Sequence, residues 1–358
     1  MRRASGRAGA LLAALAMATY VAGCSSSTSP STDFDPQATA TDVQAVVAAF
    51  QANQDAFASM SVASQALGAS LAGQMLPKDP GQIMPSAAQV QALAKDLTTQ
   101  AIFPSNYLGT TFVYDPAQAV YVQSDQTGAP SNGVRVIYYA IDPMTNMPAT
   151  PLNALGYIDL TDETTAQSTR LGITIVKTGS SDVTLADYYV DVSYTSTQTD
   201  MSATLASVGY VSNGTDELDF DLTETLGLSQ TSGVSINLDY QASLAGQDIS
   251  VHFQADGTID LQTDSPGTMN ATFTIQNGSD QAVLTVSFTG DNTISGTLAY
   301  NGSTVVNISG TGDSPTFTKP DGSAVSQSDL TALQSVWNGV GNLFDFVGQL
   351  FGPAGTSA

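Results

Sequence analysis

The sequence predicts an α+β protein: a helical N-terminal section, a long curled antiparallel β-meander and a C-terminal amphipathic helix packed on the apolar face of the sheet. Apolar residues recur with a helical period over residues 41–102, alternate with polar residues over 103–325, and form a helical stripe again over 326–351. Short Asn-Gly and Asp-Gly pairs separate the alternating runs, which is typical of hairpins. No helical pattern interrupts the alternating region, so parallel β-α-β units are not expected.

The first residues predict a secretory signal peptide over 1–23. Arg2, Arg3 and Arg7 precede an apolar run from Ala8 to Met17, and small residues follow. The run is shorter than the roughly 20 apolar residues that a membrane-spanning helix needs.

The only cysteine of the chain stands at the end of this segment. Val21, Ala22, Gly23 and Cys24 read aliphatic, small, small, cysteine, and this order resembles the lipobox of bacterial lipoproteins. The resemblance implies cleavage between Gly23 and Cys24, a diacylglycerol group on the sulfur and often an N-acyl chain such as palmitate. It implies no other cofactor. Ser25 after the cysteine is similar to lipoproteins sorted to an outer membrane, which implies that location in an organism with two membranes. The alternative is ordinary cleavage nearby, with Cys24 as an incidental thiol.

Residues 24–40 predict a flexible tether, because Ser, Thr, Pro and Asp dominate them. In the helical section, Thr41 with Gln44 and Ser86 with Gln89 form two capping boxes before apolar residues at helical spacing. A break in the first helix is expected near Ser61, and a proline-rich loop between the two boxes.

The meander is expected to bury one face of each strand and leave the other in water. In "GVSINLDYQASL", for example, Val234, Ile236, Leu238 and Tyr240 alternate with polar residues. The expected hairpin turns are Asn213-Gly214, Asp256-Gly257, Asn277-Gly278, Gly290-Asp291 and Asn301-Gly302.

The C-terminal helix, 326–351, is predicted to form one fold with the meander, and 352–358 to form a tail. Ser326 and Asp329 resemble a helix cap. The apolar stripe, which is expected to fill the core or line an apolar pocket, consists of Trp337, Val340, Phe344, Val347 and Phe351.

Charge and rare residues exclude several functions. The net charge of −23 becomes about −26 when the three arginines of the signal are removed, and such a chain repels nucleic acid. A single cysteine excludes internal disulfides. His252 is the only histidine, so zinc sites and Ser-His-Asp or Cys-His catalysis have no complete set of residues.

Carboxylates are the remaining chemistry. Glu217, Asp219 and Asp221 alternate on the predicted water-facing side of one strand, where acid–base catalysis is not favoured. No catalytic residue is therefore predicted, and the protein is expected not to be an enzyme.

Calcium is a weaker candidate ligand. The acidic residues that could bind it are Asp256, Asp260 and Asp264, but their spacing does not match an EF-hand loop. No metal site is therefore predicted.

Three functions remain open at this point. The preferred one is a membrane-anchored envelope lipoprotein with a structural or interaction role, whose partner is an envelope protein or polymer. The second is a carrier that holds a lipid or another apolar small molecule between the curved sheet and the helices. The third is a carboxylate-based hydrolase.

Replacing Cys24 with serine tests the anchor. Because the modified sulfur is lost, we expect uncleaved precursor to accumulate and the protein to move from the detergent phase to the aqueous phase on phase partitioning. A variant that is still cleaved at Gly23 and still partitions into detergent would contradict the prediction.

Overall fold

The computed structural model describes residues 34–51, 53–67, 102–166, 168–196, 200–229, 233–259, 267–289 and 292–351. All of them belong to one unit, Phe34–Ala358. Three helices are described: α1 (Pro36–Gln51), α2 (Gln54–Leu67) and α4 (Gln327–Phe351).

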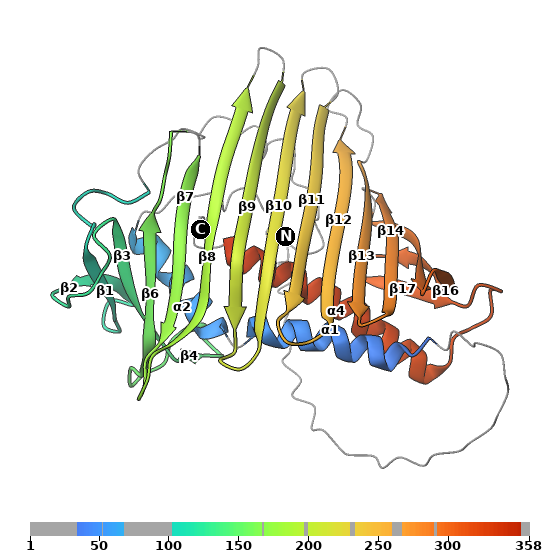
Figure 1. Cartoon of the computed structure of the whole chain (residues 1–358), viewed down its shortest axis with the longest axis horizontal. Helices are drawn as coiled ribbons and strands as arrows, with labels where there is room; N and C mark the ends of the chain where they lie inside the picture. The colour runs from blue at the N-terminus through green and yellow to red at the C-terminus, as the bar shows by residue number, and fades with distance from the viewer. Residues whose placement is uncertain are drawn as a thin grey trace, which may run out of the picture. The chain divides into compact units, whose positions relative to one another are not determined.

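Most of the described chain forms one 15-stranded sheet (Figure 1). Its strands are β1 (Thr110–Asp115), β2 (Val120–Ser124), β3 (Gly133–Tyr139), β6 (Ala154–Asp162), β7 (Thr169–Lys177), β8 (Val183–Ser196), β9 (Asp200–Ser212), β10 (Glu217–Ser229), β11 (Gly233–Leu244), β12 (Ile249–Ile259), β13 (Thr268–Asn277), β14 (Asp280–Thr289), β15 (Thr293–Tyr300), β16 (Ser303–Thr311) and β17 (Ser314–Thr318). A separate hairpin pairs β4 (Ile141–Asp142) with β5 (Met147–Pro148).

The predicted long antiparallel meander is confirmed. From β6 to β17 each strand pairs with the next one along the chain, and every one of these pairs is antiparallel. The order of the described strands ends at β17 on one side and β2 on the other, so the sheet is open.

Local turn chemistry explains some of the hairpins. Asn301 and Gly302 have φ values of 47° and 80°, as a two-residue turn between β15 and β16 requires. The expected turn at Asp256-Gly257 is wrong, since both residues lie inside β12. Gly257 serves packing instead: a Cβ atom there would lie 3.3 Å from the Met269 side chain on β13. Gly290 and Asp291 are outside the described residues.

The sheet begins with an exception to the sequential order. β1 and β2 form an antiparallel hairpin, but β3 then lies beside β1 and parallel to it, with Thr110 opposite Val134. The Gly109 N–H donates to the Gly133 carbonyl at 2.8 Å and fixes the start of this pairing. The sequence pattern gives no sign of this crossover, because both strands alternate in the same way.

Helix α1 begins at Pro36 rather than at the expected cap, Thr41. The Asp35 carboxylate accepts hydrogen bonds from the backbone N–H groups of Gln37 and Ala38 at 2.9 and 3.2 Å, and proline is well suited to the first helical position. Residues 36–40, predicted as tether, are therefore helical.

The break between the first two helices falls at Asn53, not near Ser61. The Asn53 side chain is buried and donates to the Ser212 carbonyl of β9 at 2.9 Å. The second predicted helix, which starts at Ser86, is outside the described residues.

Helix α4 begins as expected, with the Asp329 N–H donating to the Ser326 hydroxyl at 3.2 Å. It contacts α1, and both helices run across the strands on one side of the sheet (Figure 1). Two hydrogen bonds join α4 to the strand region: the Tyr188 hydroxyl donates to the Leu350 carbonyl and the Trp337 indole N–H to the Gly312 carbonyl, each at 3.3 Å.

Two glycines of α4 test the α1–α4 contact. A Cβ atom at Gly339 would overlap Val43 Cγ1 of α1, whereas a Cβ atom at Gly341 would meet no atom within 4 Å. We expect Gly339→Ala to lower the free energy of unfolding by about 1–3 kcal/mol through overpacking. Gly341→Ala should raise it by up to about 1 kcal/mol through helix propensity. Urea denaturation of both variants measures the difference, and equal effects would show that α1 does not pack closely on α4.

Candidate functional site

The sheet has two chemically different faces. We call the face that contacts α1 and α4 the inner face and the opposite one the polar face. On β10, Leu218, Phe220 and Leu222 are buried on the inner face, while Asp219 and Asp221 between them are exposed on the polar face. Each face is a candidate site.

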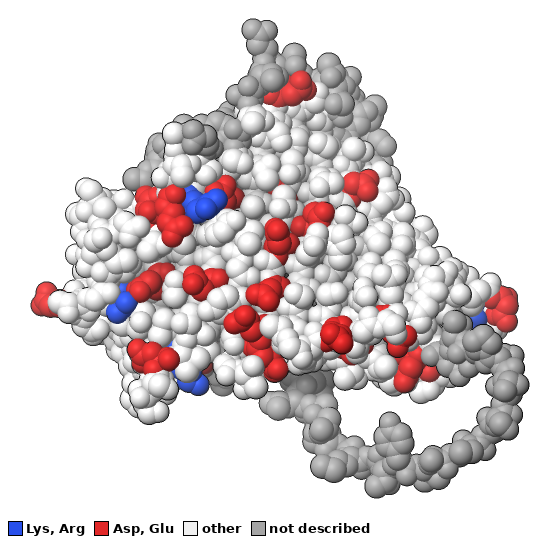
Figure 2. Space-filling view, viewed as in Figure 1, with Lys and Arg blue, Asp and Glu red and all other residues white. Residues whose placement is uncertain are grey.

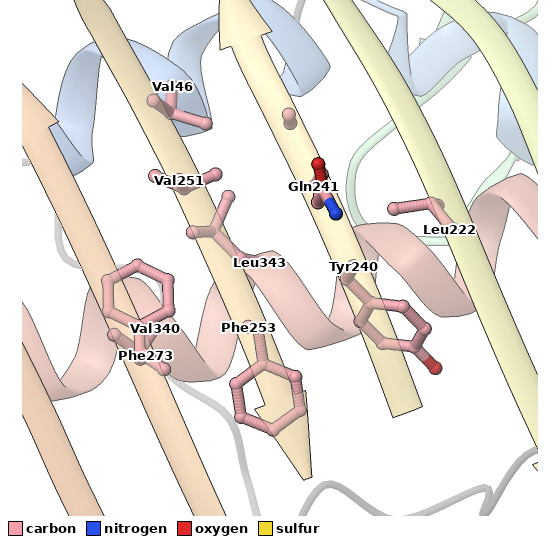
Figure 3. Close-up of a pocket in the computed structure, with 10 residues that line it drawn as sticks. Val46, Leu222, Tyr240, Gln241, Val251, Phe253, Phe273, Val340 and Leu343 are labelled. Carbon is pink, nitrogen blue, oxygen red and sulfur yellow. The ribbon is translucent and has the colours of Figure 1, made fainter. Parts of the chain in front are cut away.

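A small apolar pocket lies between the helices and the inner face (Figure 3). Its lining comes from α1, α4 and strands β10–β13: Val46, Leu222, Tyr240, Gln241, Ala242, Val251, Phe253, Phe273, Val340 and Leu343. The cavity volume is about 40 Å³, which leaves room for a few waters only.

The apolar stripe of the C-terminal helix is partly placed by the structure. Val340 is buried and lines the pocket, and Trp337 is half-buried against the core. At Phe344, Val347 and Phe351 the structure describes the helical backbone of α4 but not the side chains.

Among the described residues one carboxyl is fully buried on the inner face, and it is not among the residues predicted from the sequence. Glu224 of β10 is 2% exposed, and its Oε2 atom has no hydrogen-bond partner among the described residues. Leu205 of β9 and Leu238 of β11 flank it directly. Burial raises the pKa of Glu224 to about 8, so the group carries its proton at neutral pH. The period-2 pattern from Leu218 to Leu226 places Glu224 on the apolar phase and was the signal that could have found it.

Two further polar side chains lie near Glu224. Ser207 of β9 and Tyr240 of β11 both flank Leu222, the inner-face residue that precedes Glu224 on β10. Ser207 is fully buried and its hydroxyl has no partner among the described residues. Burial and the nearby Glu224 raise the pKa of Tyr240 well above its usual value.

The polar face carries the only histidine. His252 of β12 lies on this face, and its Nε2 atom is 2.8 Å from a carboxylate oxygen of Asp239. Burial alone would raise the pKa of Asp239, but hydrogen bonds from His252, Gln254 and Gln241 lower it below its usual value. The cluster of His252, Asp239, Gln254 and Gln241 contains no nucleophile, and it contains no second histidine or cysteine that could bind a metal.

Both described arginines of the sheet are neutralised in the same way. Arg135 forms a bidentate ion pair with Asp159: its Nε and Nη2 atoms each donate to a carboxylate oxygen at 2.7 Å. The guanidinium group also lies over the Tyr157 ring. Arg170 pairs with Asp191 at 2.9 Å and lies over the Tyr189 ring. In each case the aspartate lies directly opposite the arginine on the neighbouring strand. The tyrosine lies two residues before the aspartate on that same neighbouring strand.

The remaining predicted site residues are only partly described. Gly23 and Cys24 lie outside the described residues, as do Asp260 and Asp264. Asp256 is exposed on the polar face of β12. Within the described ranges no group of three His, Cys, Asp or Glu side chains could hold a metal ion.

Comparison with protein-family models, with curated proteins and with solved structures finds no match to this chain. Of the helices described here, none has the length and apolar character needed to cross a membrane.

Glu224 predicts a specific pH dependence of stability. The pKa of Glu224 is higher in the folded chain than in the unfolded chain. Burial of Glu224 therefore costs no charge-related stability below about pH 4.5, and the free energy of unfolding falls as the pH rises from there towards 8. Glu224→Gln removes this loss. We expect the variant to match the wild type near pH 4 and to exceed it at pH 8 by on the order of 4 kcal/mol.

The matched control is Asp221→Asn, on the exposed face of the same strand. Urea denaturation from pH 4 to pH 9 measures all three proteins. If the difference between Glu224→Gln and the wild type does not change with pH, then Glu224 is not a protonated buried acid.

Proposed function

We propose that this protein is a lipid-anchored protein of the bacterial cell envelope with a non-enzymatic, structural or interaction role, and that the polar face meets its partner. The observation that carries the proposal is the charge of that face. Between residues 178 and 318 the chain has no lysine or arginine, while Asp187, Asp219, Asp221 and Asp256 are exposed there. Figure 2 shows acidic side chains scattered over this face and only a few basic ones, most of them towards its left side.

The anchor is proposed from the residues around Cys24. If the lipid is attached there, the chain between Cys24 and Pro36 spans at most about 40 Å when fully extended. The sheet would then stay close to the bilayer, and in an organism with two membranes that bilayer is proposed to be the outer membrane.

The partner that fits this face brings positive charge. Arg135 and Arg170 are already paired with aspartates, so the exposed carboxylates have few cations of their own chain to offset them. A cationic protein segment or polymer would be drawn to the face by long-range attraction. A nucleic acid would be repelled.

For the inner face we infer that the sheet curls around α1 and α4, whose side chains fill it as a core. The support is the small enclosed volume of about 40 Å³, far below the roughly 300–1,000 Å³ typical of ligand pockets. A lipid carrier needs a cavity of several hundred Å³, and the observed pocket is much smaller. The carrier role is therefore the second candidate. The hydrolase is third, because Asp219 and Asp221 are exposed to water, where a carboxyl is poorly suited to acid–base catalysis.

Neutralising the polar face tests the proposed role. We expect a decalysine peptide to bind the detergent-purified protein, and binding to weaken at least about tenfold in the triple variant Asp219→Asn, Asp221→Asn, Asp256→Asn. The control removes the same charge from exposed aspartates outside these strands: Asp125, Asp182 and Asp248. Isothermal calorimetry at low salt compares the two. Equal weakening in both variants would mean that only the net charge matters and that the polar face is not a binding surface.

A further inference from the structure

The two ends of the 15-stranded sheet differ in how well their outermost strand is protected. At one end, β17 contains Pro315, which has no N–H to donate, and its Thr318 pairs with Ala324 in a further bridge. At the other end, β2 (Val120–Ser124) contains no proline and no charged residue. Within the described part of the chain, the backbone of β2 hydrogen-bonds only to β1. Figure 1 shows β2 at the margin of the sheet, with β1 as its one neighbouring strand.

An apolar row crosses the polar face and ends at this free edge. In order from the edge it consists of Val122, Val113, Ile137, Tyr157 and Val176, on β2, β1, β3, β6 and β7. The first four are half-buried although they lie on the face that is turned away from the helices, and Val120 of β2 is 41% exposed. The row is an exception on a face that otherwise carries mainly Asp, Thr, Ser and Asn. Exposed apolar side chains beside unpaired backbone groups are typical of a surface that binds another strand.

We propose that β2 is a docking edge for a second copy of this chain, and that the β2 strands of the two copies pair antiparallel across a two-fold axis. The pairing gives the free backbone N–H and C=O groups of each strand a partner on the other strand. It also brings Val120 and Val122 of the two copies side by side, so that the two apolar rows become one. The inference goes beyond the proposed function and does not depend on it, because the exposed aspartates of that function lie on β8, β10 and β12.

Charge favours contact between two copies at this edge. Two chains of net charge −23 repel one another, and the repulsion is strongest between residues 178 and 318, where no lysine or arginine is present. In contrast, β2 and the apolar row are uncharged, and Arg135, Arg170 and Lys177 offset part of the acidic charge on the neighbouring strands β3, β6, β7 and β8. A cationic partner would be drawn to the acidic strands instead of to β2. The uncharged edge of a second copy therefore suits β2 better.

The size of the contact predicts a reversible dimer. β2 has five residues, whereas a stable protein–protein interface uses about 20–30 residues from each partner. We therefore expect the dimer to dissociate on dilution, with a dissociation constant of about 1–100 μM.

Sedimentation equilibrium of the full chain tests the proposal, in a detergent whose density matches the solvent and at about 1 to 300 μM protein. Val122 and Thr316 are the central residues of the two outermost strands, β2 and β17. We expect Val122→Lys to raise the dissociation constant at least about tenfold, because it places like charges beside one another in the paired strands. Thr316→Lys changes the net charge equally and should leave the dissociation constant unchanged.

A crosslink tests the geometry without a weakened variant. A short bismaleimide added to cells that produce Val122→Cys should join two copies of the chain, because the new thiols lie close together across the two-fold axis. The same reagent should not join two copies of Thr316→Cys. The unaltered chain, whose only cysteine is Cys24, should not be crosslinked either.

Four results would overturn the proposal. A monomer mass at the highest concentration would show that the chain does not dimerise. Equal dissociation constants for Val122→Lys and the unaltered protein would place the contact elsewhere. Equal crosslinking of Val122→Cys and Thr316→Cys would indicate random collision. A crosslink from Val122→Cys to a different protein alone would make β2 a docking edge for another partner. None of these results bears on decalysine binding to the aspartates of β10 and β12.

Discussion

Burial of one broad apolar sheet face is the constraint on which the other features depend. The strands from β8 to β16 each place a row of apolar side chains on the inner face, and such a face is not stable in water. With a single cysteine the chain has no disulfide to help, so packing must supply the stability. Three features of α1 and α4 are relevant here: Asp35 and Pro36 start α1, Gly339 lets α1 approach α4, and Val340 and Leu343 line the pocket between α4 and the strands.

Features that depend on local sequence were predictable, and those that depend on a neighbouring strand were not. Three features depend only on residues close together in the chain and are predicted from the sequence: the alternation of apolar residues, the Asn301-Gly302 turn and the Ser326 cap. The Asp256-Gly257 pair predicts a turn, but Gly257 lies inside β12, where it leaves room for Met269 on the neighbouring strand. The parallel pairing of β1 with β3 is also decided by which strands meet. In the candidate site, the solvent-facing acids of β10 are predicted from the sequence. Glu224 is not, because a polar residue was expected to face water, although its position in the alternation places it on the buried side of the strand.

The two faces treat charge in opposite ways. On the polar face the arginines are each held by an aspartate and a tyrosine, and Asp239 is stabilised by three neighbouring side chains. On the inner face Glu224 Oε2 has no hydrogen-bond partner among the described residues, and burial raises the pKa of Glu224 to about 8. Natural proteins accept such a cost mainly where a group is needed for something other than stability. The position of Glu224, and not the number of acids on the surface, is therefore the most informative feature of the charge distribution.

The contact between α1 and α4 also has a consequence for how the chain is made. The Gln37 side chain donates to the Ser328 carbonyl, 291 residues later in the chain, so this contact forms only after every strand of the sheet has been synthesised. The strands of the meander, in contrast, pair with their sequence neighbours and can zip together hairpin by hairpin as they emerge. A growing sheet with its apolar side uncovered therefore precedes the folded protein, and a long nascent intermediate of this kind is prone to aggregate unless a chaperone shields it until α4 arrives.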